Sequence, residues 1–474
     1  AADGHRVTAQ CLIVDEQGNA IADVEGLQLQ RVDEKALLGE RGNSWQNWLY
    51  QVNWIQKSGF SIRQTVEFAP VSQHLATMQS HMPALLDPQT WADYQQGARH
   101  FDELVSAFIV DAFNQLHIAL SPGAELELNA VMANSAIAAK HRRLFVRLLN
   151  MLTEDRLLES TGENRWQVPA ALTQPATKHI DPQQYAQELM QRLPQVEAEL
   201  VLIATCGARL ANVLQGAIEG TDALFPDADF SMASRVYRDS VGARALNDLV
   251  RDNIAAHLAQ VPASRGLRIL EIGAGTGGTT SSIVPVLPAG RVQYVFTDIS
   301  PLFLDLARQR YEDSDFMQYQ LLDITRDVVE QGFVPASFDI VVAANVVHAT
   351  PDIDVTLQHI RQLLVPGGSL LLLEGIAPQR WLDLTFGLTE GWWCFNDRRR
   401  ADYPLLSAPQ WQMLLTEHGF ADTAVQLLQP DIKQAVLHAK ADAAMPVAAQ
   451  PKHWLVFAGE DALSAQTVSL LHAG

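Results

Sequence analysis

The chain contains 474 residues, more than the roughly 100–200 residues of a typical domain, so we expect about two to four structural units. Hydrophobic residues make up 48% and charged residues 19%, which excludes a disordered or low-complexity protein because enough apolar surface is available to offset chain entropy. The 34 basic and 54 acidic residues give a net charge of −20, which argues against binding to nucleic acid or to an anionic membrane.

The three cysteines, Cys11, Cys206 and Cys394, have neither metal-ligand spacing nor the pattern of a small disulfide framework. We therefore expect a cytoplasmic protein without a metal site. The longest apolar stretch, about Leu200 to Ile218, is interrupted by polar residues and predicts a buried helix rather than a membrane span. The start lacks the pattern of a signal peptide, and the chain stops at Gly474 within an expected helix, so we expect a segment of a larger protein.

The first forty residues have the alternating pattern of β-strands. Two alternating runs, His5 to Val14 and Ala20 to Val32, flank the turn residues Asp15 to Asn19 and predict a β-hairpin. Because an isolated hairpin is marginally stable in water, we expect this one to pair with a sheet outside the chain. Residues 33–47 are polar and irregular, which predicts a linker.

From about Trp48 to Ala223 the helical period dominates. Apolar spacings of three and four predict helices over Trp91 to Ile118, Tyr185 to Leu193 and Val196 to Leu214. A helix within Ala138 to Leu152 is followed by a short hairpin, the order found in winged-helix units. Its basic residues are few against the overall negative charge, so we interpret it as a structural cap rather than a DNA-binding unit.

After Arg265 the strand-like and helix-like segments alternate. This alternation predicts an α/β fold with a parallel sheet covered by helices on both faces, finishing with an antiparallel pair. A featureless segment from Ala441 to Gln450 predicts a second linker, and a new strand begins at His453. The parallel strands are expected over Leu267–Ile272, Val292–Thr297, Phe316–Leu322, Phe338–Ala343 and Ser369–Leu373, the helices over Leu302–Tyr311 and Val355–Leu364, and the late strands over Ala424–Leu428 and Ala435–Ala439.

A glycine-rich loop, Glu271 to Thr279, lies where a strand ends and a helix begins. Its glycines allow a tight turn and let a ligand approach the backbone closely. Asp298 ends the next strand, 21 positions beyond Gly277, close to the interval of about 20 at which an acidic residue binds ribose hydroxyls. Gly273, Gly275 and Gly278 also match the dinucleotide fingerprint, so the loop by itself leaves a nicotinamide cofactor and S-adenosylmethionine both open.

The context of the loop favours the methyl donor. The carboxylate of Glu271 can approach a cationic amino-acid ligand, and Asp323, after the third strand, is placed for the amine of an adenine. With the Pro-Gly-Gly turn before Leu370, these features resemble the class I S-adenosylmethionine-dependent methyltransferases and imply their Rossmann-like sheet. The cofactor-binding residues expected from this resemblance are Glu271, Gly273, Ala274, Gly275, Gly277, Asp298, Ile299, Asp323, Ile324 and Asn345.

A histidine and a glutamate follow two strands that are neighbours in such a sheet. His348 follows the strand that ends near Ala344, and Glu374 ends the strand Leu370 to Leu373. A neutral imidazole can remove a proton, and a carboxylate on its other nitrogen would fix the tautomer and stabilise the imidazolium. The alternative is a loop histidine and a capping acid, but placement at the ligand-binding edge favours catalysis.

The resemblance becomes more specific with four further segments. Glu271 to Thr280, Phe338 to His348, Leu373-Glu374 and Gly387 to Ser407 are similar to the C-methyltransferase domain of polyketide synthases, and the likeness extends over about Trp48 to Lys440. It implies a His–Glu dyad as the base, with Tyr237 lining the active site. Trp392 and Trp393 are candidates for the acceptor tunnel, with packing an equal alternative.

The same resemblance implies a domain order and partners. We expect a dehydratase-like hairpin and linker over 1–40, a helical lid subdomain over 48–230, the methyltransferase core over 231–440, and a linker with the start of a ketoreductase-like domain over 441–474. The implied substrate is a β-ketoacyl chain on the phosphopantetheine arm of an acyl carrier protein, and the implied product of the donor is S-adenosylhomocysteine. A non-catalytic scaffold domain and an O-methyltransferase remain as alternatives, and dehydrogenase activity is a distant third.

Overall fold

A computed structural model of the chain describes residues 6–14, 20–30, 68–79, 81–170, 181–262, 265–429 and 432–442. The described residues fall into two compact units, of which the first contributes one hairpin and the second carries the rest. The hairpin consists of β1 (Arg6–Val14) and β2 (Ala20–Gln30), paired antiparallel as predicted. Several expected segments lie outside the described residues: the linker 33–47, the segment 48–67 and the ketoreductase-like start. Of the second expected linker, 441–450, only residues 441 and 442 are described.

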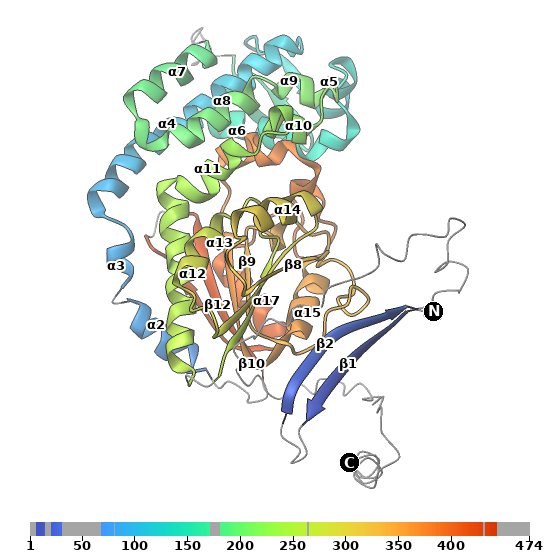
Figure 1. Ribbon diagram of the computed structural model, residues 1–474. Helices are drawn as coiled ribbons and strands as arrows, with labels where there is room; N and C mark the ends of the chain where they lie inside the picture. The colour runs from blue at the N-terminus through green and yellow to red at the C-terminus, as the bar shows by residue number, and fades with distance from the viewer. Residues whose placement is uncertain are drawn as a thin grey trace, which may run out of the picture. The chain divides into compact units, whose positions relative to one another are not determined.

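The second unit is built on a seven-stranded sheet (Figure 1). Five parallel strands lie in the spatial order β8–β7–β6–β9–β10, and β12 and β11 continue the sheet antiparallel. The strand order therefore reverses between the neighbouring strands β6 and β9. Open α/β sheets bind ligands at such a switch point, beyond the carboxyl ends of the strands. The strands are β6 (Leu267–Ile272), β7 (Val292–Asp298), β8 (Met317–Leu321), β9 (Phe338–Ala344), β10 (Leu364–Gly375), β11 (Phe420–Gln426) and β12 (Gln434–Ala441).

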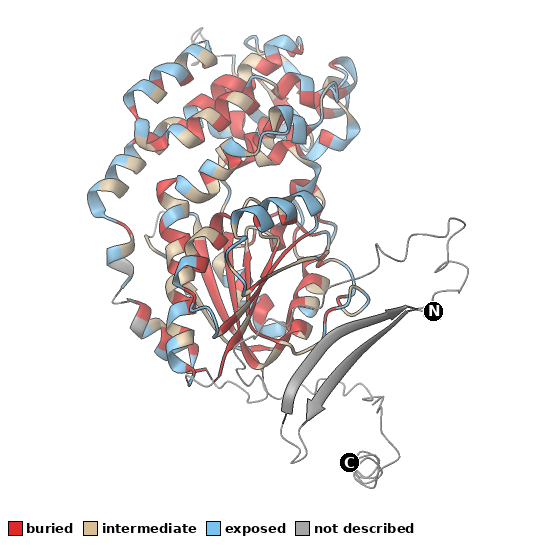
Figure 2. Cartoon of the chain, viewed as in Figure 1, coloured by how far each residue is buried: buried red, intermediate tan, exposed pale blue. Residues whose placement is uncertain are grey.

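Alternate residues of the central strands belong to different hydrophobic clusters. On β10, Leu371 and Leu373 pack into one cluster, while Leu370 and Leu372 pack into another. Because side chains of a strand point alternately to opposite faces, both faces of this sheet are covered (Figure 2). The covering helices are α12 (Val241–Gln260), α13 (Gly278–Ile283), α14 (Pro301–Arg310), α15 (Ile353–Leu363) and α17 (Ala408–Glu417).

A helical subdomain, consisting of α4 to α10 with residues 380–395, lies beyond one end of the sheet (Figure 1). Its core forms around the 28-residue helix α4 and includes both α6 and α8. The helices are α4 (Pro88–Gln115), α5 (Leu128–Asn134), α6 (Arg142–Glu154), α7 (Pro182–Arg192), α8 (Glu197–Gly207), α9 (Leu210–Leu214), α10 (Gly220–Leu224) and α16 (Arg380–Leu384), with short 3-10 turns at Ala139–His141, Pro194–Val196, Pro226–Ala228, Phe386–Leu388 and Glu390–Trp393. Helix α11 (Ser231–Asp239) connects this subdomain to α12.

The expected α/β class is confirmed, and several details differ from the sequence predictions. The helix expected over Val196–Leu214 is divided into α8 and α9, separated by Ala208 and Arg209. The predicted winged-helix order is present as α6 followed by β4 (Glu159–Gly162) and β5 (Arg165–Gln167), which pair with β3 (Glu125–Glu127). None of the helices in the described ranges combines the length and apolar character that crossing a membrane requires.

Packing also divides the second unit differently from the expected boundary at residue 230. Helices α2 (Val71–Gln79) and α3 (Met82–Leu85) contact α12, and α2 also contacts β11 and β12, so this part of the expected lid packs on the seven-stranded sheet and its covering helix. Conversely, Leu388 and Phe395 join the core of the helical subdomain. Hydrophobic contact rather than order along the chain decides which residues form each body.

Three buried histidines join α2 to the sheet. His74, His257 and His438 pack with ring centroids 4.4–5.1 Å apart. His74 Nε2 lies 2.8 Å from Asn253 Oδ1, and His438 Nε2 lies 2.8 Å from Ser369 Oγ. Burial lowers the pKa of His74, lowers the pKa of His257 to about 3 and lowers the pKa of His438 well below its usual value. The folded protein therefore keeps all three imidazoles neutral.

This cluster predicts acid sensitivity of the fold. Because the pKa values are lowered on folding, the unfolded chain binds protons first, and stability is lost as pH falls below about 6.5. A histidine that stays neutral in the folded protein contributes a loss of at most about 1.4 kcal/mol per pH unit. Urea denaturation between pH 7.5 and 5.0 measures the slope, and His257→Leu is expected to reduce it by up to about 1.4 kcal/mol per pH unit. The exposed His117→Asn leaves the slope unchanged, and an unchanged slope for His257→Leu would contradict the assignment.

Candidate active site

A cavity of about 920 Å³ opens at the carboxyl ends of the parallel strands, between the sheet and the helical subdomain. Its floor consists of the glycine loop after β6, the segment after β9 and the end of β10. Its roof consists of residues of α4, α8, α11, α16 and the turns around Phe386 and Trp392. The volume lies within the range of about 300–1,000 Å³ that is typical of small-molecule sites.

Backbone conformation explains the glycines of the loop. Gly273, Gly275 and Gly277 have φ values of +60°, +55° and +75°, a region that residues with a Cβ rarely adopt. A Cβ on Gly273 would also lie 2.6 Å from Val346 Cγ2, and one on Gly278 would lie 2.9 Å from the carbonyl oxygen of Tyr237. The loop therefore packs against the segment after β9 on one side and against α11 on the other.

Two acidic residues hold the loop in place. Glu271 Oε2 accepts hydrogen bonds from Thr280 Oγ1 at 2.5 Å and from the Tyr294 hydroxyl at 2.7 Å, and burial raises the pKa of this carboxyl to about 7. Asp298 Oδ2 accepts from the Gly275 N–H at 2.9 Å, and its Oδ1 accepts from the Ser300 N–H. Burial likewise raises the pKa of Asp298.

The structure brings some of the predicted cofactor residues to the cavity and leaves others outside. Glu271, Gly273, Ala274, Gly275, Ile299 and Asn345 line it. Ile299 is 69% exposed, and Asn345, with φ of +55°, adopts a conformation that asparagine tolerates. Four predicted residues do not line the cavity: Gly277, Asp298, Asp323, whose Oδ1 accepts from the Thr325 N–H and hydroxyl, and Ile324, whose side chain is buried in the core.

The predicted pair forms one buried unit. His348 Nδ1 lies 2.6 Å from Glu374 Oε2, and Glu374 Oε1 accepts from the backbone N–H groups of Val346 at 3.2 Å and Val347 at 2.8 Å. Glu374 is completely buried and His348 is 6% exposed, lining the cavity. With Nδ1 bonded to a carboxylate, Nε2 remains as the basic nitrogen, so the pair can accept a proton from a carbon or oxygen acid.

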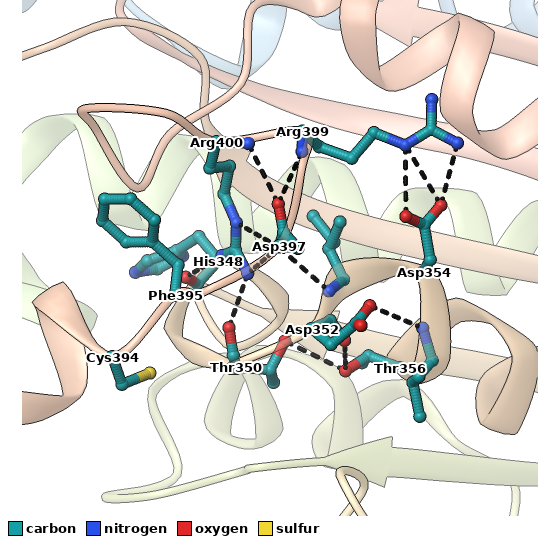
Figure 3. A network of polar contacts seen from close by, with 12 residues as sticks. His348, Thr350, Asp352, Asp354, Thr356, Cys394, Phe395, Asp397, Arg399 and Arg400 are labelled. Carbon is teal, nitrogen blue, oxygen red and sulfur yellow. Dashed lines mark hydrogen bonds and ion pairs between the residues drawn. The ribbon is translucent and has the colours of Figure 1, made fainter.

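A second ion pair holds the backbone of His348 and was not predicted from the sequence (Figure 3). Arg400 donates from Nη1 to the His348 carbonyl and from Nη2 to the Thr350 carbonyl, both at 2.6 Å. Asp397 bonds the same guanidinium and also accepts from the Ile353 N–H, at the start of α15. Both side chains are buried. The sequence Asp397 to Arg400 contains three arginines and resembles an exposed charge run, so no local signal identified this contact.

Aromatic side chains cover the imidazole. The rings of Trp392 and His348 meet edge to face with centroids 5.2 Å apart, and Tyr237 packs on Phe386 at 5.2 Å. Burial, reinforced by the charge of Glu374, raises the pKa of Tyr237, so its phenol stays protonated. Trp393 does not line the cavity: its indole N–H donates to the Gly387 carbonyl within the helical subdomain. Among the described residues, no group of three or more His, Cys, Asp or Glu side chains is arranged to hold a metal ion.

Known proteins resemble this chain in sequence and in structure. A sequence profile described as a methyltransferase domain matches residues 270–370. The non-reducing polyketide synthase adrD of Penicillium roqueforti is 33% identical over 323 residues, which cover 67% of this chain and 12% of that protein. The chain thus spans about an eighth of the length of this relative.

Two solved structures are similar to this chain over most of its length. The CurJ carbon methyltransferase aligns with a TM-score of 0.73 and 38% identity, over 78% of this chain and 98% of that one. The trans-methyltransferase CalH, solved as a complex with SAH, aligns with a TM-score of 0.57 and 26% identity, over 74% and 92% of the two chains.

The Arg400–Asp397 pair generates a prediction about stability. Arg400→Met leaves a buried carboxylate without its countercharge, which costs about 3–5 kcal/mol of unfolding free energy, as measured by urea denaturation. Replacing both partners, with Arg400→Met and Asp397→Leu together, is expected to recover part of that loss. The control Arg399→Met breaks a more exposed pair with Asp354 and is expected to cost about 1 kcal/mol or less. Equal losses for Arg399→Met and Arg400→Met would contradict this account.

Proposed function

The chain belongs to the family of polyketide synthase C-methyltransferase domains, and on that premise we propose that it transfers a methyl group from S-adenosylmethionine to the α-carbon of a β-ketoacyl chain on an acyl carrier protein. The observation that carries the proposal is the buried pair of His348 and Glu374, in which His348 Nδ1 lies 2.6 Å from Glu374 Oε2 and His348 lines a cavity of about 920 Å³. A base is required for this reaction because a carbon acid must lose its proton before it can accept a methyl group.

The residues of the loop after β6 fit the methyl donor. The positive φ of Gly273 and Gly275 leaves backbone without side chains facing the cavity, where an adenosyl group can approach closely. Ile299 offers an exposed apolar surface for a purine, and Asn345 offers an amide. Asp298 and Asp323 do not line the cavity, and the family resemblance alone assigns them to the ribose and the adenine amine. When bound, S-adenosylmethionine supplies an electrophilic methyl group on a sulfonium.

The dyad and its surroundings suit deprotonation of an acid flanked by two carbonyl groups. His348 Nε2 accepts the α-proton, and the Glu374 carboxylate stabilises the imidazolium that forms. The protonated phenol of Tyr237 is a hydrogen-bond donor at the same cavity and would stabilise negative charge on an enolate oxygen. The α-carbon then takes the methyl group, and S-adenosylhomocysteine is the leaving product.

The helical subdomain would act as a lid that excludes water and forms part of the acceptor entrance, with Trp392 shaping the acceptor side. Because the chain spans about 12% of its relative adrD, we propose that it acts within a larger synthase. In that arrangement residues 1–40 would end a dehydratase-like domain, 48–230 and 231–440 would form lid and core, and 441–474 would begin a ketoreductase-like domain. The carrier protein would bring the acyl chain by its phosphopantetheine arm, in the cytoplasm.

The test is methyl transfer to a β-ketoacyl carrier protein, followed by mass spectrometry. Wild type is expected to add one methyl group, and product fragmentation is expected to place it on the α-carbon. His348→Ala is expected to lower the rate by about 100-fold or more, because it removes the general base, while S-adenosylhomocysteine affinity changes little. Glu374→Gln is expected to lower the rate less, since it keeps the imidazole.

The matched control is His81→Ala, which removes an exposed histidine between α2 and α3. Its rate is expected to equal that of wild type. A methyl group on oxygen would favour an O-methyltransferase, and no methyl transfer by folded wild type that binds the donor would favour a scaffold domain. Unchanged activity of His348→Ala would overturn the role of the dyad.

A further inference from the structure

One buried carboxylate at the cavity takes no part in the proposed chemistry. Glu199 lies in the first turn of α8, is 1% exposed and lines the cavity from the side of the helical subdomain. Its Oε2 has no hydrogen-bond partner, whereas the hydroxyls of Tyr94 and Ser240 hydrogen-bond the carboxyl group. A buried oxygen of an acid without a donor is costly, so this position is suited to a ligand that supplies a hydrogen bond or a positive charge.

The neighbouring wall of the cavity is the beginning of a long helix. Ser240 caps the 20-residue helix α12, with its Oγ accepting from the Ala243 N–H, and Gly242 and Ala243 line the cavity. A Cβ placed on Gly242 would meet no atom within 4 Å, so this turn borders open space. Backbone N–H groups at the start of a helix carry a partial positive charge and attract carboxylates.

The two features together complement a zwitterion. The free carboxylate oxygen of Glu199 favours an ammonium group, and the first turn of α12 favours a carboxylate beside it. An α-amino acid carries both groups on one carbon. The same part of the cavity adjoins the glycine loop, because α13, which follows that loop, packs against both α11 and α12.

Glu271 is the competing candidate for the ammonium, because its carboxylate also reaches the cavity. Its Oε2 already accepts from Thr280 and Tyr294, both within the core of the sheet domain. Both bonds reach the same oxygen and hold the loop, so Glu271 still competes through its Oε1. Glu199 is favoured because its Oε2 is buried without a donor.

We propose that Glu199 binds the α-ammonium group of the methionine part of the methyl donor, while the first turn of α12 binds its α-carboxylate. This inference rests on the proposed function, since it assumes S-adenosylmethionine as the ligand. A residue of the helical subdomain thereby contributes directly to donor binding, so occupancy of the donor site stabilises the contact between α8 and the start of α12.

The test compares two ligands by isothermal titration calorimetry. The probes are S-adenosylhomocysteine and its analogue in which hydrogen replaces the α-amino group. A charged hydrogen bond to a carboxylate contributes about 1.5–3 kcal/mol, so wild type is expected to bind the desamino analogue about 10–100-fold more weakly. Glu199→Gln is expected to weaken S-adenosylhomocysteine binding by a similar factor and to leave the affinity for the analogue within about twofold.

The matched control is Glu197→Gln, which neutralises an exposed glutamate in the same turn of α8, paired with Arg235. It is expected to leave both affinities unchanged. Thermal melting establishes that each variant is folded, and Glu199→Asp, which keeps the charge on a shorter side chain, is measured in the same way if Glu199→Gln is unfolded. For Glu199→Asp the preference for the amino ligand is expected to shrink by about tenfold.

The outcomes separate the inference from the proposed function. Equal weakening of both ligands by the substitution, or no weakening of either, overturns the role of Glu199 while wild-type binding of S-adenosylhomocysteine still supports the proposed function. A loss confined to the amino ligand in Glu271→Gln, but not in Glu199→Gln, overturns the assignment in favour of Glu271. Failure of folded wild type to bind S-adenosylhomocysteine overturns the proposed function and the inference together.

Discussion

The carboxylate of Glu374 connects the sheet to the turn that carries His348. It ends a buried parallel strand, accepts two backbone N–H groups of the turn after β9 and contacts the imidazole of His348. A fully buried carboxylate is tolerated only where such donors replace water. Its contacts therefore hold the turn in one conformation and set the tautomer of the histidine at the same time. The dyad depends on β9 and β10 being adjacent and in register.

Contacts on the far side of the turn complete this support. Arg400 bonds the His348 carbonyl, and Asp397 binds Arg400 while also accepting from the Ile353 N–H at the start of α15. His348 thus contacts the Glu374 carboxylate through its ring and the Arg400 guanidinium through its backbone carbonyl. Each charge is itself paired, so the desolvation cost of burying the group is offset locally. Preorganisation of this kind reduces the reorganisation that proton transfer would otherwise require.

The helical subdomain does more than cover the sheet. It contributes Tyr94 and Glu199 to the cavity and shares its core with residues 380–395, which follow the last parallel strand. In return, α2 and α3 precede the subdomain in sequence but pack against α12. The sheet and the helical subdomain are therefore each packed against a segment that lies on the other side of the expected boundary in sequence. These contacts join the two parts at several places. A cavity enclosed in this way is formed only when both bodies are folded.

The sequence alone determined the sheet, the glycine loop and the pair His348 and Glu374, because strand periodicity, positive-φ glycines and strand-end positions are local properties of the chain. It did not reveal that Arg400 is buried against the turn that carries His348 or that Glu199 is buried at the cavity, since a charge run and a helical glutamate look the same whether exposed or buried. Trp393 shows the converse: beside Trp392 in sequence, it packs into the subdomain core instead of the cavity. Burial and partnership between residues distant in the chain arise only from tertiary packing, and packing decided which polar groups face a ligand.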